Sequence, residues 1–214
     1  MKSLIYVFSL MFLCSTAFCQ NDEDGQPLPK PEMADPAAGM SATEMGEMDE
    51  KAMMEMWAKM IAPGEEHEKL AQDVGKYTYV STFWMEPGAE PMKSTGKSTI
   101  EPIMDGRYFV DKHEGEMMGT TFKGMGVSGY DKVSKEYTST WIDNMGTGTL
   151  MFRGKMNEQG QLETFADTVN PMTGQKEKHK TVITQGANGF TMDYFVISNG
   201  SETQSMNIVY TRVE

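Results

Sequence analysis

The stretch GMGVSGYDKVSKEYTSTWIDNMGTGTLM, residues 124–151, decides the fold class of this chain. Side chains alternate between two faces along a strand, and the residues on both sides of the polar turn at 131–135 follow that alternation. Tyr137, Trp141 and Asp143 therefore share one face of the second strand. Glycines interrupt the first strand, where they allow an antiparallel sheet to bend. The pattern predicts a hairpin in a curved sheet whose inner face surrounds a cavity.

Similar alternating segments continue in both directions from this hairpin. Short turns rich in Gly, Asn, Asp and Pro separate them. Ten strands with no helix between them favour an all-β fold, a closed up-and-down antiparallel barrel, because closure removes exposed strand edges. The predicted strands span residues 76–85, 93–103, 107–116, 120–130, 136–144, 148–157, 162–169, 177–185, 190–198 and 202–212.

The first nineteen residues predict export from the cytoplasm. Lys2 precedes an apolar run at 4–13, which is shorter than the ~20 apolar residues of a membrane-spanning helix. We expect a signal peptide over 1–19, cleaved near Cys19, and a periplasmic or extracellular protein with no transmembrane segment in the mature chain. Cys14 would leave with it, so the mature chain would have neither disulfides nor a cysteine nucleophile.

The segment before the first strand divides into two parts. Residues 20–42 combine prolines with acidic residues, a composition typical of a disordered linker. Residues 43–61 predict an amphipathic helix, because Ser or Thr can cap its start and a Pro-Gly pair follows its end. The barrel domain is expected over 62–214, and it begins with a short helical segment at 63–70.

The predicted helix is rich in methionine, which supports two interpretations. Its methionines and Trp57 form an apolar stripe at helical spacing that could pack on the barrel or dock a partner. Thioether sulfurs are also soft ligands suited to Cu(I), so a copper-handling role is the alternative. That metal site would use Met45, Met48, Met53 and Met56.

Charge and motifs argue against several classes of function. The formal net charge is −12, and no basic stripe with interleaved aromatics is present, which argues against nucleic-acid binding. His67, His113 and His179 show no paired metal-ligand spacing, although a single strand histidine such as His179 can hold haem in some small barrels. The sequence has no nucleophile elbow and no phosphate-binding loop. It indicates no particular cofactor and no oligomeric state.

Several motifs together resemble the family catalogued as domain of unknown function 1579. The resemblance covers about Ala62 to Arg212, and it implies no established activity. The motifs that carry it are EEHEKL, STFWMEPGAEP from Ser81, DGRYF from Asp105, GTTFKGMGVSGYD from Gly119, STWIDNMGTG from Ser139, NPMTG from Asn170 and IVYTR from Ile208.

The chain is more distantly similar to the lipocalin-like barrels. Those folds begin their first strand with glycine, one residue and tryptophan, and an arginine late in the last strand packs across that ring. Gly75, Tyr77 and Arg212 occupy comparable places, with tyrosine in place of tryptophan. The resemblance implies that Arg212 is structural and closes one end of the barrel through a cation–π contact.

Three functions follow as hypotheses from these observations. The leading one is a binding module for a small, partly apolar molecule held inside the barrel. The second is an enzyme that uses the carboxyl of Asp143 in the cavity, although a buried ion pair between Asp143 and Arg107 is the simpler interpretation. If Arg107 does not pair with Asp143, its guanidinium could instead bind the carboxylate of an amphipathic ligand. The third is the metal or partner role of the helix. The predicted ligand-binding residues are Trp84, Arg107, Tyr130, Trp141, Asp143 and Tyr210.

Overall fold

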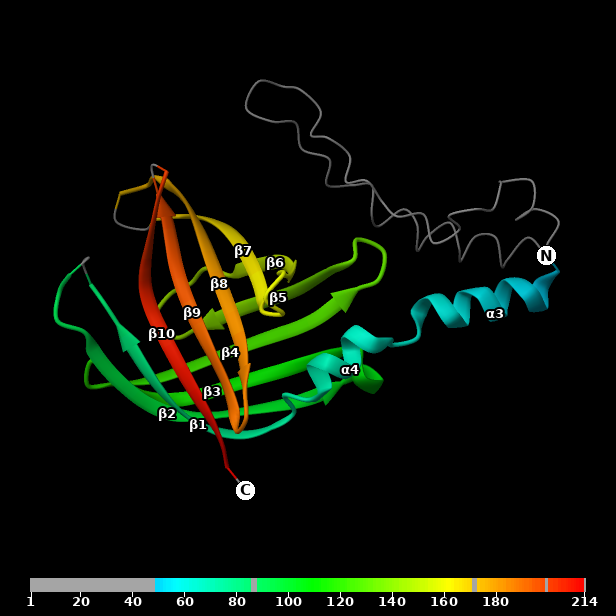
Figure 1. The fold of residues 1–214 in the computed structure, drawn as a ribbon, viewed down its shortest axis with the longest axis horizontal. Coiled ribbons are helices and arrows are strands. Elements are labelled where there is room, and N and C mark those ends of the chain that lie inside the picture. Colours follow the sequence, from blue (N-terminus) through cyan, green and yellow to red (C-terminus); the bar gives the residue numbers. More distant parts are fainter. Residues whose placement is uncertain (1–48, 86–87, 171–172, 199, 214) are drawn as a thin grey trace. The chain divides into compact units, whose positions relative to one another are not determined.

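The computed structural model describes residues 49–85, 88–170, 173–198 and 200–213, and ten antiparallel strands close into a barrel there (Figure 1). Each strand pairs with its neighbours in sequence, and β10 pairs with β1 to complete the circle. The predicted closed up-and-down barrel is therefore confirmed. The strands are β1 Gly75–Phe83, β2 Met92–Ile103, β3 Tyr108–Met117, β4 Thr120–Asp131, β5 Glu136–Asp143, β6 Leu150–Met156, β7 Leu162–Val169, β8 Lys176–Gly186, β9 Gly189–Ser198 and β10 Ser201–Val213.

The turn between β2 and β3 shows how local chemistry sets the strand ends. A short 3₁₀ turn, η2, spans Met104–Gly106, and Asp105 and Gly106 have φ values of 57° and 78°. Asp and Gly tolerate this left-handed conformation better than bulky residues do. The tight turn lets β3 return antiparallel to β2, with Ile103 opposite Tyr108.

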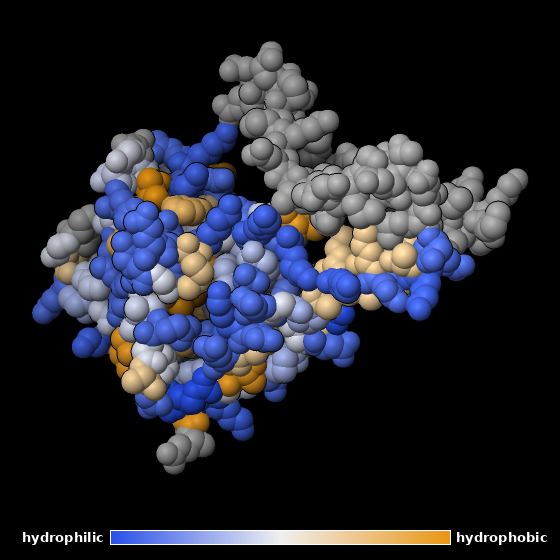
Figure 2. All heavy atoms as spheres, turned by 45° about the vertical axis from the view of Figure 1, so that its right-hand side comes forward, coloured by the Kyte–Doolittle hydropathy of each residue, from blue (hydrophilic) through white to orange (hydrophobic). Residues whose placement is uncertain are grey.

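The packed core occupies part of the barrel interior. A cluster of buried side chains from β1, β2, β3, β9 and β10 forms it, and the outer surface is mainly hydrophilic in the view of Figure 2. Leu70, Ile183 and Met192 pack against this cluster. The cluster contains Tyr77, Tyr79, Ile100, Phe109, Phe190, Ile208 and Tyr210.

Helix α4, Glu65–Ala71, and the residues that follow it close one end of the barrel. The Gly64 N–H donates to Nδ1 of His67 at 3.1 Å, which ties down the start of the helix. His67 is buried with its ring edge against Tyr130, and burial lowers the pKa of its imidazole. Leu70 and Val74 pack on the core, so the helix covers the barrel end with its apolar side.

Arg212 joins this closed end to the first strand. Its guanidinium carbon lies 4.9 Å from the ring centroid of Tyr77, which is the contact that the resemblance to the lipocalin-like barrels implied. Its nitrogens also donate to the carbonyl oxygens of Val74 and Gln72, each at 2.7 Å. A Cβ at Gly75 would overlap the guanidinium, so only glycine fits beside it.

Helix α3, Glu50–Ile61, ends where the sequence predicted, but it begins at Glu50 rather than Thr43. Asp49 is its N-cap, because its carboxylate accepts the Ala52 N–H at 2.7 Å. The predicted signal peptide, the linker and the first residues of the predicted helix lie outside the described residues. Within the described residues, no helix has the length and apolar character required to cross a bilayer.

Candidate ligand-binding cavity

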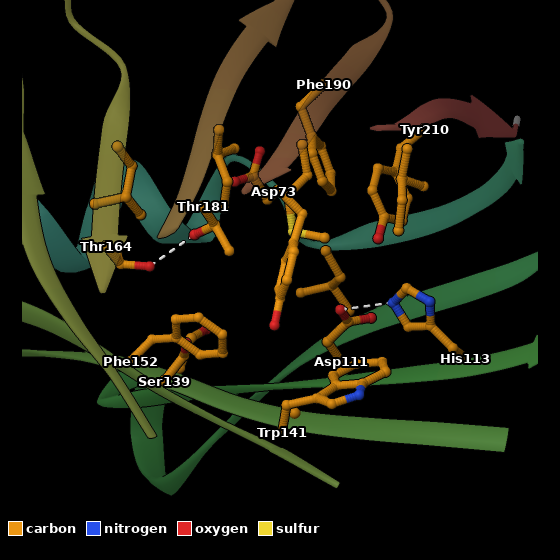
Figure 3. Close-up of a pocket in the computed structure, with 18 of the residues that line it drawn as sticks. Asp73, Asp111, His113, Ser139, Trp141, Phe152, Thr164, Thr181, Phe190 and Tyr210 are labelled. Atoms are coloured by element: carbon orange, nitrogen blue, oxygen red, sulfur yellow. Dashed lines mark hydrogen bonds and ion pairs between the residues drawn. The ribbon is translucent and has the colours of Figure 1, made fainter. Parts of the chain in front are cut away.

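The barrel encloses a cavity of about 730 Å³ beside the packed core. Residues 69–73, at the end of α4 and just beyond it, contribute to one end of its lining, and every strand contributes to the wall. Most of the lining is apolar, and aromatic rings dominate it (Figure 3). The aromatic residues are Tyr79, Phe83, Trp84, Phe109, Phe122, Tyr137, Trp141, Phe152, Phe190, Tyr194 and Tyr210.

Trp141 projects from β5 into this cavity. Its indole N–H donates to Oδ2 of Asp143 at 2.9 Å, and its ring stacks on Phe122 with a centroid separation of 6.5 Å. The ring lies directly over Gly124 on the neighbouring strand, where any Cβ would overlap it. The glycines of β4 therefore provide space for an aromatic ring, besides allowing the sheet to bend.

Tyr79 uses the same arrangement over the neighbouring strands β2 and β3. Its phenol reaches over Gly96 of β2 and Gly115 of β3, which are register partners, and a Cβ on either would collide with its oxygen. Glycines that lie under aromatic rings thus shape the wall at two places, below Trp141 and below Tyr79. Each ring packs directly on backbone atoms, which hold their position better than a flexible side chain would.

Ser98, Asp111 and His113 form a polar cluster in the cavity wall. The Ser98 hydroxyl donates to Oδ1 of Asp111 at 2.7 Å, and Nε2 of His113 lies 2.8 Å from Oδ2. Ser98 and His113 are register partners on β2 and β3, and both are buried. Tyr79, Trp141 and Tyr210 surround the imidazole with ring centroids 5.0–5.6 Å away.

The order of this cluster matters for its chemistry. The carboxylate lies between the hydroxyl and the imidazole, so Ser98 donates to Asp111 and not to a histidine base. A serine nucleophile needs the opposite order, with the imidazole adjacent to the hydroxyl. The geometry thus presents a carboxylate to the cavity and does not activate Ser98.

Other buried polar groups face the cavity as well. The hydroxyls of Thr164 and Thr181 bond each other across β7 and β8 at 2.7 Å. By contrast, the hydroxyls of Tyr79, Ser81 and Tyr137 have no hydrogen-bond partner among the described residues, although all three side chains are buried and line the cavity. Buried polar groups are ordinarily paired, and the oxygens of these three hydroxyls are themselves covered by protein atoms, so they are exceptions to that rule in the cavity wall.

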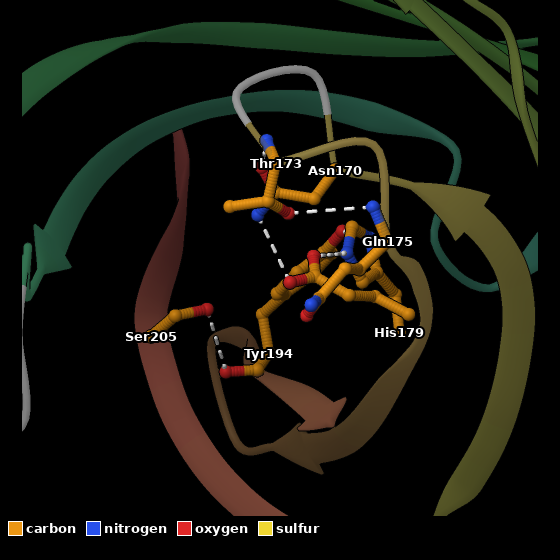
Figure 4. A network of polar contacts seen from close by, with 7 residues as sticks. Asn170, Thr173, Gln175, His179, Tyr194 and Ser205 are labelled. Atoms are coloured by element: carbon orange, nitrogen blue, oxygen red, sulfur yellow. Dashed lines mark hydrogen bonds and ion pairs between the residues drawn. The ribbon is translucent and has the colours of Figure 1, made fainter. Parts of the chain in front are cut away.

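A second polar network lies toward the β7–β8 turn (Figure 4). The Tyr194 hydroxyl bonds Nδ1 of His179, and Nε2 of His179 lies 3.8 Å from a carboxylate oxygen of Glu177. Asn170 donates to the other oxygen of Glu177 at 2.9 Å. Burial raises the pKa of the Tyr194 phenol, and the charges of Asp143 and Glu177 raise it further. Both ring nitrogens of His179 face protein groups, so this geometry does not support His179 as a haem ligand.

Four of the six predicted ligand-binding residues line the cavity: Trp84, Trp141, Asp143 and Tyr210. Asp143 has no arginine within ion-pair distance among the described residues. Its Oδ1 accepts the Met145 N–H at 2.9 Å and its Oδ2 accepts the Trp141 indole. Both bonds orient the carboxylate, and they position Trp141 as well.

Arg107 and Tyr130 do not line the cavity. Arg107 precedes β3 and has a helical backbone, so the strand alternation that aligned it with Phe109 does not extend to it. Its guanidinium bonds the Met104 carbonyl at 3.2 Å and lies 3.6 Å from Asp105. Tyr130 packs between His67 and Tyr137 at the end that α4 closes.

The methionines proposed for copper are only partly described. Met53 and Met56 lie three positions apart on α3, where no residue is fully buried. Met45 and Met48 lie outside the described residues. Within the described residues, no group of three or more His, Cys, Asp or Glu side chains is arranged to hold a metal ion.

Comparison with known proteins identifies one family. The model of the family described as "Protein of unknown function (DUF1579)" matches residues 62–212, which is the part of the chain where the motifs resemble it. No curated protein matches the chain.

Proposed function

We propose that this chain, which belongs to the DUF1579 family, is an exported binding protein that holds a small, partly apolar molecule inside its barrel. The cavity of about 730 Å³ carries the proposal. Ligand pockets of ~300–1,000 Å³ are typically apolar and aromatic, with a few fixed polar groups that orient the ligand. The barrel interior has this composition.

The size of the cavity is unusual for a structural core. Protein interiors pack as densely as organic crystals, and voids larger than a water molecule are few. Six of the seven residues in the buried cluster also line the cavity, all except Tyr77, so the buried cluster forms part of the cavity wall. Aromatic rings that pack on glycines belong to the same wall. These features support a preformed site.

The carboxylates in the lining support a ligand with polar groups as well as apolar ones. Asp111 lines the cavity and its side chain is 28% exposed, so a polar group of a bound molecule could reach it. A purely hydrocarbon ligand would displace water from this carboxylate without replacing the lost hydrogen bonds.

Export is supported by the N-terminal sequence alone. Lys2, the apolar run at 4–13 and cleavage near Cys19 would deliver a barrel without cysteine to the periplasm or the extracellular space. Expression of the full chain in a secreting host tests this part. N-terminal sequencing of the exported protein should begin at or near Gln20, and retention of the intact N-terminus in the cytoplasm would contradict it.

Native mass spectrometry of the protein purified from its own host tests the binding function. We expect a fraction of the protein to carry a bound small molecule that denaturation releases. Leu150 and Met151 are neighbours on β6, and Leu150 lines the cavity whereas Met151 is 63% exposed on the outside. Leu150→Trp should abolish the bound mass and Met151→Trp should keep it. Equal retention by both variants would overturn the proposal.

A further inference from the structure

The charges in the cavity lining have one dominant sign. Three aspartates line it from separate parts of the fold, Asp73 after α4, Asp111 on β3 and Asp143 on β5. Among the described lining residues the only lysine or arginine is Lys69, and its side chain is exposed to solvent. Among the described lining residues, the three carboxylates therefore have no buried lysine or arginine beside them, and the imidazole of His113 next to Asp111 is the one buried group there that can carry a positive charge.

Asp111 is the carboxylate whose surroundings are best defined. Its two oxygens accept from Ser98 and His113, at 2.7 and 2.8 Å, and its side chain keeps 28% of its surface exposed. An ionised carboxylate offers about four acceptor positions, so these contacts leave some free. Neither a lysine nor an arginine lies within ion-pair distance of it among the described residues.

Asp73 is a lining carboxylate that is held by a neutral amide. Its oxygens accept from the Gln185 amide, each at 3.1 Å. Burial nevertheless raises the pKa of its carboxyl, and this effect exceeds the opposing influence of Gln185 and Arg212. A positive charge inside the cavity would favour the ionised carboxylate.

Aromatic rings complete the environment around Asp111. Trp141, Tyr79 and Tyr210 surround the adjacent imidazole, and all three line the cavity (Figure 3). Ring faces attract ammonium groups by about 0.5–2 kcal/mol, and cages of aromatic rings are a common means of binding substituted amines. The three rings pack around His113, which bonds Asp111, so a carboxylate and aromatic surface lie together in the lining, a combination that suits an organic cation.

We infer that the cavity selects a positively charged ligand, an amine or a quaternary ammonium compound with an apolar body. This inference rests on the proposed function and adds the charge of the ligand. An anionic ligand would share the cavity with three aspartates, and Arg107, which the sequence offered as the partner of a ligand carboxylate, lies outside the cavity.

Three probes with one apolar body and different charges test this inference. 4-Phenylbutylamine, 4-phenylbutan-1-ol and 5-phenylpentanoate, which all carry the phenylbutyl group, can be compared by isothermal titration calorimetry at neutral pH and moderate salt. We expect the amine to bind at least about tenfold more tightly than the alcohol, and the carboxylate to bind most weakly. Equal or tighter binding of the alcohol or the carboxylate would overturn the inference and leave the proposed function intact. Absence of binding by all three would overturn both.

Two matched substitutions locate the charge that is responsible. Asp111→Asn should weaken binding of the amine about tenfold and leave binding of the alcohol unchanged, because it removes charge with little change of shape. Asp167→Asn removes the same charge from an 87% exposed side chain on β7, and it should change neither affinity. An Asp111→Asn protein that folds and keeps the full preference for the amine would contradict the assignment. The comparison of probes on the unsubstituted protein does not depend on either variant.

Discussion

The indole ring of Trp141 occupies the space in which a side chain of Gly124 would stand, so the ring packs directly on the backbone of β4. This contact links the two strands of the central hairpin and places an aromatic face on the cavity wall. The space that the indole needs explains why Gly124 and Gly126 lie on the inner face of β4. Glycines beneath an aromatic ring therefore determine the shape of this part of the cavity wall.

Gly124→Ala should destabilise the protein by about 1–3 kcal/mol, because the new methyl group forces Trp141 out of its position. Gly146 lies in the loop after β5, and a Cβ there would meet no atom within 4 Å. Gly146→Ala should stay within ~0.5 kcal/mol of the original stability. Urea unfolding followed by circular dichroism measures both, and equal effects would contradict the packing role of Gly124.

Arg212→Met should destabilise the protein by about 2–4 kcal/mol, because the carbonyls of Val74 and Gln72 lose charged donors and Tyr77 loses its cation. Arg153→Met is the matched control. Arg153 is 61% exposed and lies 3.7 Å from Glu136, a surface ion pair worth less than ~1 kcal/mol. Comparable losses in the two variants, measured by urea unfolding, would show that Arg212 does not close the barrel end.

The Thr164–Thr181 hydroxyl pair predicts a non-additive result. Thr164→Val alone leaves the buried Thr181 hydroxyl unpaired and should destabilise the protein by about 1–3 kcal/mol. Adding Thr181→Val removes the unpaired group, so the double variant should be close to the original stability. A double-mutant cycle by thermal or urea unfolding measures this coupling. Additive losses would show that the two hydroxyls act independently.

Asp73 predicts a particular dependence of stability on pH. Burial raises the pKa of its carboxyl in the folded state above the ordinary value of 3.8, so the folded protein binds this proton more tightly than the unfolded chain does. Its contribution to stability is then fully present below pH 3.8 and is lost as pH rises through the folded-state pKa. Asp73→Asn should therefore gain stability relative to the original protein as pH rises from 3.8 toward neutrality. A difference between the two proteins that does not change over this pH range would contradict it.

The sequence predicted the barrel closely, because its determinants are local. Alternation and turn chemistry placed the strand Leu162–Val169 at its observed bounds, and the segment predicted at 148–157 is Leu150–Met156 in the structure. Ten antiparallel strands joined by short turns would expose two long edges as an open sheet, so pairing of the first and last strands was the expected arrangement. The same alternation also brought Trp141 and Asp143 to the cavity.

The polar cluster in the cavity was missed because it depends on register. Asp111 and His113 are two positions apart on β3, which is a visible signal that they share a face. Ser98 joins them only because β2 pairs with β3 so that Ser98 lies opposite His113, and sequence alone does not determine that pairing. The prediction that Arg107 lines the cavity was wrong for a different reason. It assumed that the strand begins at Arg107, but this residue has a helical backbone and precedes the strand.

The three tryptophans report directly on where a ligand binds. Trp84 and Trp141 line the cavity, whereas Trp57 lies on α3. In a ¹⁵N-labelled protein each indole N–H gives its own resonance, which can be followed during titration with 4-phenylbutylamine. Binding in the barrel predicts saturable shifts of the Trp141 and Trp84 resonances while that of Trp57 stays in place. Shifts confined to Trp57, with those of Trp141 and Trp84 unchanged, would contradict a ligand site inside the barrel.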